Sequence, residues 1–243
     1  YTGKAKGITV FDVDVENGMF KERCEIEVDN SSYVIASSDG KTLYSIADEG
    51  VVSFRILPNG SLARLNSSSI RGMRGCHLCT DEEDKYVFVS GYHDGKTTVL
   101  SLNPDGSVGK IVDGVFDRGY GSVAERNFRP HVTCTRRMPD NRFVLSVDNG
   151  IDQVKIYRFN DKEQKLVQVD AIRCDLESAP RHFRYSKDGK FIYLMYELKK
   201  AIEVYTYKTG DRAPVIEKIQ TISTTSTKNP DNLTAACAMR MSV

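Results

Sequence analysis

Short apolar stretches alternate with polar turns along the whole chain. In each recurring unit an apolar stretch is followed by a turn containing Asp, Asn, Gly or Pro, and then by a second stretch rich in β-branched and aromatic residues. Four such units occupy residues 32–45, 76–89, 130–146 and 181–194, and a fifth opens at residues 238–242. This pattern predicts antiparallel strands joined by tight turns, and no amphipathic helical pattern longer than two turns interrupts it.

The units recur at a nearly constant spacing. The intervals between their aligned positions are 44, 54, 51 and 56 residues, measured at Tyr33, His77, His131, His182 and Ala238. Each interval also contains a third strand that ends near a turn, and the remainder has room for a fourth strand. Four short antiparallel strands per unit of about 40–50 residues form the blade of a β-propeller. An up-and-down barrel or a sandwich would not need a constant period, so we predict an all-β propeller of four-stranded antiparallel blades.

Composition excludes several classes of protein. The 34 positive and 33 negative side chains give a net charge of +1, which provides no basic surface for nucleic acid. No apolar run approaches the roughly 18 residues of a membrane span, and the N-terminal residues lack the apolar core of a secretory signal. Six cysteines are too few for a disulfide scaffold. We therefore expect a reduced, cytoplasmic protein without cofactor or metal, either a monomer or a weak homo-oligomer.

Three short motifs, in this order and spacing, carry a family resemblance. They are Arg129-Pro130-His131, then Ala179-Pro180-Arg181-His182 with the turn Lys187-Asp188-Gly189, and then Tyr196-Glu197-Leu198. With these motifs the sequence resembles, from its first residue to its last, the seven-bladed propeller lactonases. That family includes bacterial 6-phosphogluconolactonase and a fungal carboxymuconate-lactonizing enzyme. The resemblance implies a metal-independent lactonase that acts on a small anionic lactone without a covalent intermediate.

Three features depart from the family pattern. Arg129 stands where the family has the first His of His-Pro-His, and residues 238–242 read Ala-Met-Arg-Met-Ser where the family often continues Glu-Ile-His-Ile-Ser. Seven blades of about 50 residues need about 340 residues. The 243 residues of this chain hold only about five blades. We therefore expect residues 1–243 to form a single propeller domain that holds about five of seven blades and is truncated at the C-terminus.

The resemblance implies that His131, Arg181 and Glu197 line a polar cleft at the mouth of the central channel. Lactone opening needs a base to take a proton from water, or an acid to protonate the leaving oxygen, and His or a buried Glu suits that task. The developing oxyanion needs fixed positive charge, which a guanidinium supplies. We predict that Arg181 binds the carbonyl oxygen or an anionic substituent and that His131 is the general acid/base. Glu197 would activate water or orient the histidine.

Three further residues are candidates for substrate binding. His77 occupies the same repeat position as His131 in an earlier blade, and Arg129 is a candidate for binding an anionic group. His182 adjoins Arg181, and neighbouring residues of a strand point to opposite faces, so we expect His182 to face away from Arg181. Each of the three also has a structural interpretation, as an inter-blade hydrogen-bonding residue or as one partner of an ion pair at the rim.

The sequence Cys76-His77-Leu78-Cys79 does not predict a metal or redox site. The two thiols of a strand at this spacing point to opposite faces, and the chain has no second Cys/His pair with zinc-finger spacing. The chain also lacks a phosphate-binding Gly-rich loop and a Gly-x-Ser-x-Gly motif. Covalent serine chemistry is therefore not expected.

The leading hypothesis is hydrolysis of a small sugar-acid lactone. One alternative is a cyclase that lactonizes an unsaturated dicarboxylate at the same site. Another is a non-catalytic propeller that binds proteins or ligands, because the fold alone does not establish an enzyme. Convergence of His131, Arg181 and Glu197 around a cleft would favour an enzyme, whereas an extensive apolar face would favour a binding module.

Overall fold

The computed structural model describes residues 6–48, 50–122, 128–225 and 235–241, and all regular structure in these residues is β-strand. None of them belongs to a helix that is long and apolar enough to cross a membrane. The strands are β1 (Gly7–Asp14), β2 (Met19–Glu27), β3 (Val34–Ala36), β4 (Thr42–Ala47), β5 (Gly50–Ile56), β6 (Leu62–Ser68), β7 (His77–Thr80), β8 (Tyr86–Gly91), β9 (Lys96–Leu102), β10 (Val108–Phe116), β11 (Val132–Arg137), β12 (Phe143–Asp148), β13 (Gln153–Arg158), β14 (Val167–Arg173), β15 (Pro180–Tyr185), β16 (Phe191–Tyr196), β17 (Ala201–Lys208) and β18 (Val215–Ser223).

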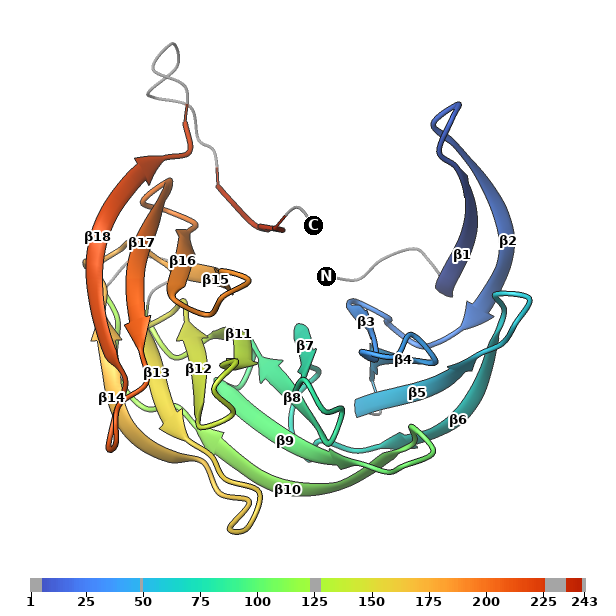
Figure 1. The fold of residues 1–243 in the computed structure, drawn as a ribbon, viewed down its shortest axis with the longest axis horizontal. Coiled ribbons are helices and arrows are strands. Elements are labelled where there is room, and N and C mark those ends of the chain that lie inside the picture. Colours follow the sequence, from blue (N-terminus) through green and yellow to red (C-terminus); the bar gives the residue numbers. More distant parts are fainter. Residues whose placement is uncertain (1–5, 49, 123–127, 226–234, 242–243) are drawn as a thin grey trace.

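The strands form antiparallel sheets in chain order, which are the blades of a propeller. Figure 1 shows four four-stranded blades fanned around a common centre, with β3, β7, β11 and β15 innermost and β6, β10, β14 and β18 outermost. The two-stranded sheet β1–β2 continues the arc beyond the β3–β6 blade. The predicted all-β propeller of four-stranded antiparallel blades is confirmed. The described residues contain four complete blades and one two-stranded sheet, where the sequence predicted about five blades.

Turns of the sequence Ser-x-Asp-Gly join the two inner strands of the first and last complete blades. Ser37 Oγ donates to Asp39 Oδ1 at 2.7 Å, and Ser186 Oγ donates to Asp188 Oδ1 at 2.6 Å. The glycine that follows each aspartate has a φ of 68° or 69°, in the left-handed region that glycine adopts without steric penalty. The local sequence therefore fixes where each inner hairpin reverses.

Apolar side chains fill the space between neighbouring blades. One cluster joins the β3–β6 blade to the β7–β10 blade and includes Ile46 and Leu78. The next blade is joined through Phe88 and Phe159, whose ring centroids lie 5.8 Å apart. Phe183 belongs to the cluster between the last two blades. Burial of each such side chain contributes about 1.5–3 kcal/mol, so this packing sets how the blades are placed around the centre.

Residues 235–241 do not form the strand that the fifth sequence unit predicts. These described residues make no strand, because they take part in no ladder of backbone hydrogen bonds. The segment nevertheless lies near the middle of the arc (Figure 1). Cys237 O accepts a hydrogen bond from Arg181 Nε at 3.3 Å, and Arg240 Nη2 donates to Tyr33 OH at 3.2 Å. It therefore contacts β15 on one side and the residue before β3 on the other.

A pair of buried carboxyl groups lies between the β7–β10 and β11–β14 blades. Asp148 Oδ1 accepts hydrogen bonds from the backbone N–H groups of His131, at 2.8 Å, and Gly150, at 2.9 Å. Asp117 Oδ1 accepts one from Tyr157 OH at 2.8 Å. The Oδ2 atoms of both aspartates are buried and have no other partner among the described residues. One proton shared between the two carboxyl groups would satisfy both atoms.

Burial is the main cause that raises the pKa of Asp148, and the negative charge of Asp117 adds to it, so that this pKa reaches about 8. Burial also raises the pKa of Asp117, while Tyr157 and Lys155 act in the opposite direction. The folded protein therefore binds one more proton than the unfolded chain between about pH 4, the usual value for aspartate, and about pH 8. Stability should fall as the pH rises through this window.

We predict that Asp148→Asn removes this pH dependence. The amide oxygen can still accept the two backbone N–H groups, and the amide NH₂ can donate to Asp117 in place of the shared proton. Urea unfolding of the variant at pH 9 should give a free energy that is higher than that of the wild type by a few kcal/mol. The exposed Asp170→Asn in the same blade is the control and should leave the pH dependence unchanged. An unchanged pH profile in the Asp148 variant would contradict the shared proton.

Candidate functional site

A pocket of about 430 Å³ opens at the inner ends of the blades. It is lined by residues of the inner strands β7, β11 and β15, by the residues just before β3 and β7, by those just after β8 and β16, and by the segment from Cys237 to Arg240. Its charged and imidazole-bearing side chains are Arg74, His77, His93, Arg181, His182, Glu197 and Arg240. Among the described lining residues, one carboxylate therefore lies with several arginine and histidine side chains, which makes the pocket suited to an anionic ligand.

An ion pair between Arg181 and Glu197 lies in this pocket. Arg181 is the second residue of β15 and Glu197 directly follows β16, and pairing of Pro180 with Tyr196 brings the two ends together. The distance from Arg181 Nη1 to Glu197 Oε2 is 2.5 Å. The arginine side chain is 20% exposed and the glutamate side chain 6%. The pair is thus mostly withdrawn from water but still reaches the pocket.

Asn149 links this ion pair to the preceding blade. Its side-chain Nδ2 donates to Glu197 Oε2 at 3.4 Å, and its backbone N–H donates to His131 O at 2.9 Å. Asn149 was not among the predicted site residues. Its position in the repeat could have identified it, because it directly follows the second strand of its blade, as Glu197 does. The other residues at this position are Asp48 and Tyr92.

His131 is packed behind the pocket lining. Its ring stacks on Tyr92 with centroids 4.2 Å apart, and Tyr92 itself lines the pocket. His131 Nδ1 lies 2.6 Å from the Tyr92 carbonyl oxygen, which can only accept, so the ring proton is on Nδ1 and Nε2 carries the lone pair. Burial lowers the pKa of His131 below the usual 6.5. The imidazole is therefore neutral at pH 7. The structure brings Arg181 and Glu197 together directly, and His131 joins them through Asn149.

The expectation that His182 faces away from Arg181 is wrong. Both residues line the pocket. The pairing of β15 with β16 is irregular between Pro180 and His182, which breaks the strict alternation of side chains at this point. Sequence alone did not reveal the irregularity, because it depends on the register of the partner strand.

The two other candidates for substrate binding have different positions. His77 is buried and lines the pocket, with its ring 4.8 Å from that of Tyr33 and 5.5 Å from that of His182. Arg129 is exposed, lies over the ring of Phe128 at 5.5 Å, and is not part of the pocket lining. His77 can therefore contact a ligand in the pocket, whereas Arg129 lies outside the pocket lining.

His77, Cys134 and His182 come together as a buried trio whose possible ligand atoms lie within 4.8 Å of one another. Their surroundings do not suit a metal ion. Arg136 Nη2 is 3.3 Å from His77 Nε2, and Arg184 Nη1 is 3.2 Å from His182 Nε2, so two guanidinium groups already donate to these nitrogens. Burial also raises the pKa of the Cys134 thiol, which keeps it protonated. The donor set is therefore unsuited to a divalent cation.

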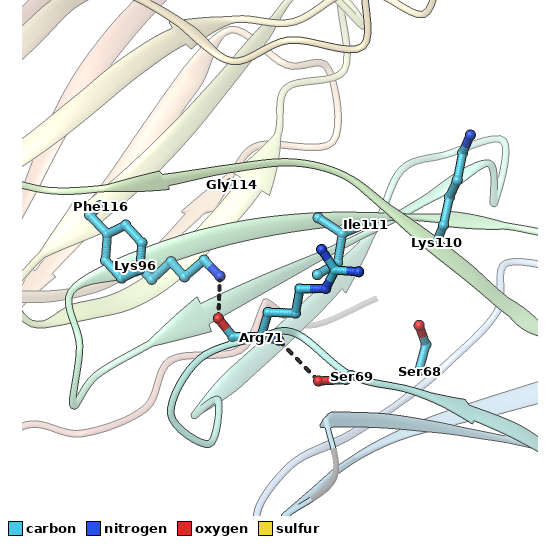
Figure 2. Close-up of a pocket in the computed structure, with 8 residues that line it drawn as sticks. All are labelled: Ser68, Ser69, Arg71, Lys96, Lys110, Ile111, Gly114 and Phe116. Carbon is cyan, nitrogen blue, oxygen red and sulfur yellow. Dashed lines mark hydrogen bonds between the residues drawn. The ribbon is translucent and has the colours of Figure 1, made fainter.

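A second cavity, of about 610 Å³, lies between the outer strands β6 and β10. Figure 2 shows Lys96 Nζ directed at the Arg71 carbonyl oxygen, with Arg71 N in turn bound to Ser69 Oγ. Lys96 Nζ also donates to Ile70 O at 2.8 Å, so the buried ammonium holds the loop after β6 in place. The described residues that line this second cavity include neither a carboxylate nor an imidazole. It offers no general base and is therefore not the candidate active site.

Known proteins share this fold along nearly the whole chain. The 6-phosphogluconolactonase of Bacillus subtilis (strain 168) is 30% identical over 236 residues, which cover 95% of this chain and 66% of that protein. A crystal structure from Bacteroides fragilis, provisionally assigned as a 6-phosphogluconolactonase, superposes with a TM-score of 0.83 at 30% identity, covering 93% of this chain and 66% of the other. A periplasmic gluconolactonase of Pseudomonas aeruginosa shares the fold, with a TM-score of 0.84 at 24% identity and coverage of 93% and 66%.

This chain thus spans 66% of the length of each of these three proteins. The family described as "Lactonase, 7-bladed beta-propeller" matches residues 1–242. That match, together with the four propeller blades and the relatives above, shows that the chain belongs to the seven-bladed β-propeller lactonase family.

Proposed function

We propose that the protein hydrolyses a small sugar-acid lactone, with 6-phosphogluconolactone as the leading candidate. The observation that carries the proposal is the Arg181–Glu197 ion pair in a pocket whose other described charged or imidazole-bearing side chains are all arginines and histidines. Such a pocket suits a substrate with an anionic group. Two relatives, from Bacillus subtilis and Formosa agariphila, bear the name 6-phosphogluconolactonase, which supports this substrate class.

In the proposed reaction Glu197 takes a proton from a water molecule while the water oxygen attacks the lactone carbonyl carbon. Arg181 binds the carbonyl oxygen and stabilises the negative charge that develops on it. The bond between the carbonyl carbon and the ring oxygen then breaks, and the ring oxygen takes the proton back from Glu197. The product is the open hydroxy acid, which ionises to its carboxylate. No covalent intermediate is needed.

His131 has a positioning role in this proposal. It does not line the pocket, and its Nδ1–H is bound to the Tyr92 carbonyl oxygen. Its carbonyl oxygen accepts from Asn149, whose amide reaches Glu197. His131 therefore acts on Glu197 through Asn149 and on the pocket wall through Tyr92. This replaces the role of general acid/base that the sequence predicted for it.

We expect Glu197→Gln to lower kcat for lactone hydrolysis by about 10²–10⁴-fold, the usual contribution of a general base. The amide keeps the size of the side chain and can still contact Arg181, but it cannot accept the proton of water. Rates are measured from the acid released from 6-phosphogluconolactone and from gluconolactone. The exposed Glu217→Gln on β18 is the control and should keep the wild-type rate. Wild-type kcat in the Glu197 variant would overturn the proposed role.

The role of His131 is tested by a pair of substitutions. His131→Asn keeps an N–H group near the position of Nδ1 for the Tyr92 carbonyl oxygen but removes Nε2, whereas His131→Ala removes both. A positioning role predicts that the asparagine variant retains kcat within about tenfold and keeps the wild-type pH profile, while the alanine variant loses more. If His131 transferred the proton directly, both variants would lose kcat equally, by about 10²–10⁴-fold. Both would also lose the part of the pH–rate profile that reflects titration of His131.

The substrate panel also includes cis,cis-muconates, because a lactonizing cyclase remains an alternative at the same site. The proposal further includes a cytoplasmic protein that is monomeric or weakly homo-oligomeric, as the sequence predicts. The Pseudomonas neighbour is described as periplasmic, so cell fractionation is the measurement that tests the location.

A further inference from the structure

Two arginines occupy equivalent positions of the inner strands β11 and β15, and a third, Arg240, lies in the segment 235–241. Arg136 comes two residues after Cys134 on β11, and Arg184 comes two residues after His182 on β15. Residues i and i+2 of a strand have their side chains on the same face. Arg136 therefore shares a face with Cys134, and Arg184 shares a face with His182. Arg240 belongs to the segment 235–241, which forms no strand and lies near the middle of the arc (Figure 1).

These guanidinium groups converge on the two buried imidazoles. Arg136 Nη2 lies 3.3 Å from His77 Nε2, and Arg184 Nη1 lies 3.2 Å from His182 Nε2. The two imidazole rings are 5.5 Å apart. Arg240 Nη2 donates to the hydroxyl of Tyr33, at 3.2 Å, and the ring of that tyrosine packs on His77. We call these five residues, Arg136, Arg184, Arg240, His77 and His182, the axial basic cluster.

The positive charge of this cluster has no counter-ion within the described part of the chain. None of the ion pairs among those residues includes Arg136, Arg184 or Arg240. The thiol of Cys79, 3.2 Å from Arg136 Nη1, does not supply the charge, because burial raises its pKa. Arg240 is exposed and Arg184 is half-buried, whereas the guanidinium of Arg136 is largely withdrawn from water, which is unfavourable without an anion.

Both histidines are neutral and hold their proton on the same ring nitrogen. Burial, and then the charge of Arg136, lowers the pKa of His77 well below its usual value and that of His182 to about 4. Because the Nε2 atoms accept from guanidinium groups, the proton of each imidazole is on Nδ1. The Nδ1 atoms of both, and Nε of Arg136, are buried without a partner among the described residues. Each of these N–H groups therefore lacks an acceptor, which is costly inside a protein.

We propose that the axial basic cluster binds a phosphate-type oxyanion. Such a group carries a charge of about −1.5 to −2 at pH 7 and three acceptor oxygens, which match the unpaired N–H donors and the uncompensated arginines. Guanidinium is also the cation best suited to binding phosphate in a bidentate way. His77, His182 and Arg240 line the pocket that contains Arg181 and Glu197, so the anion has access from that pocket. The anion is either free phosphate or the phosphoryl group of a sugar-acid ligand.

Isothermal titration calorimetry with inorganic phosphate, 6-phosphogluconate and gluconate tests this proposal. The test variants are Arg136→Gln and Arg184→Gln, neither of which has a role in the proposed lactone hydrolysis. The control is Arg158→Gln, an exposed arginine on β13 of the same blade as Arg136. We expect the wild type and the control to bind phosphate or 6-phosphogluconate equally well. Each test variant should bind at least tenfold more weakly, and gluconate binding should not change.

The probes distinguish the two sources of the anion. Binding of inorganic phosphate that needs Arg136 and Arg184 supports a site for the free ion. Binding of 6-phosphogluconate alone, with the same dependence on the arginines, supports a site for the phosphoryl group of a ligand. The proposal is overturned if neither phosphate compound binds, or if both variants bind as the wild type does. A wild type that binds phosphate but hydrolyses no lactone would overturn only the proposed function.

Nuclear magnetic resonance of the histidines tests the proposal on the wild type alone, so the result does not depend on whether a variant folds. Added phosphate should shift the ¹⁵N and ¹H signals of the Nδ1–H groups of His77 and His182. The signals of His93, which is not part of the cluster, serve as the internal control. Unchanged signals of His77 and His182 at saturating phosphate would contradict binding at the cluster.

Discussion

Apolar packing between neighbouring blades is the interaction on which the placement of the pocket residues depends. Clusters that contain Leu78, Phe88 and Phe183 fill the successive spaces between the four-stranded blades. Because each blade runs from an inner to an outer strand in the same direction, this packing places equivalent ends of all inner hairpins at one side of the centre. The residues just after the second strands, Tyr92, Asn149 and Glu197 among them, consequently meet there although they lie far apart in sequence.

Two kinds of charged group lie at the centre. Arg181 pairs with Glu197 of the same blade at 2.5 Å, and Arg74, before β7, lies 3.5 Å from Asp48, which follows β4 of the neighbouring blade. The axial basic cluster has cations and neutral imidazoles without a carboxylate partner in the described chain. Among the described residues that line the pocket, a negatively charged substrate would therefore meet one carboxylate, Glu197, together with several arginine and histidine side chains. This arrangement favours anions and leaves Glu197 as the proton acceptor of the pocket.

The sequence predicted the parts of the structure that depend on local pattern. Alternating apolar residues and Asp-Gly turns located the inner hairpins, and the family motifs predicted that Arg181 and Glu197 line one cleft, although not that they form an ion pair. Pattern could not predict the irregular pairing at Pro180, which turns both Arg181 and His182 to the pocket, because register depends on the partner strand. Local pattern also could not predict the contact of Asn149 with Glu197, because it joins two blades. The same holds for the contact of His131 with Tyr92, which comes from another blade.

A double-substitution cycle on lactone hydrolysis tests most directly the central claim that Arg181 and Glu197 act as one unit. The kcat/KM of Arg181→Gln, Glu197→Gln and the double variant is compared with that of the wild type on the same phosphorylated lactone. If the ion pair positions the base and the oxyanion donor together, the double variant should be no more than a few-fold less active than the poorer single variant. Losses that multiply, so that each substitution has its full effect in the presence of the other, would contradict the account.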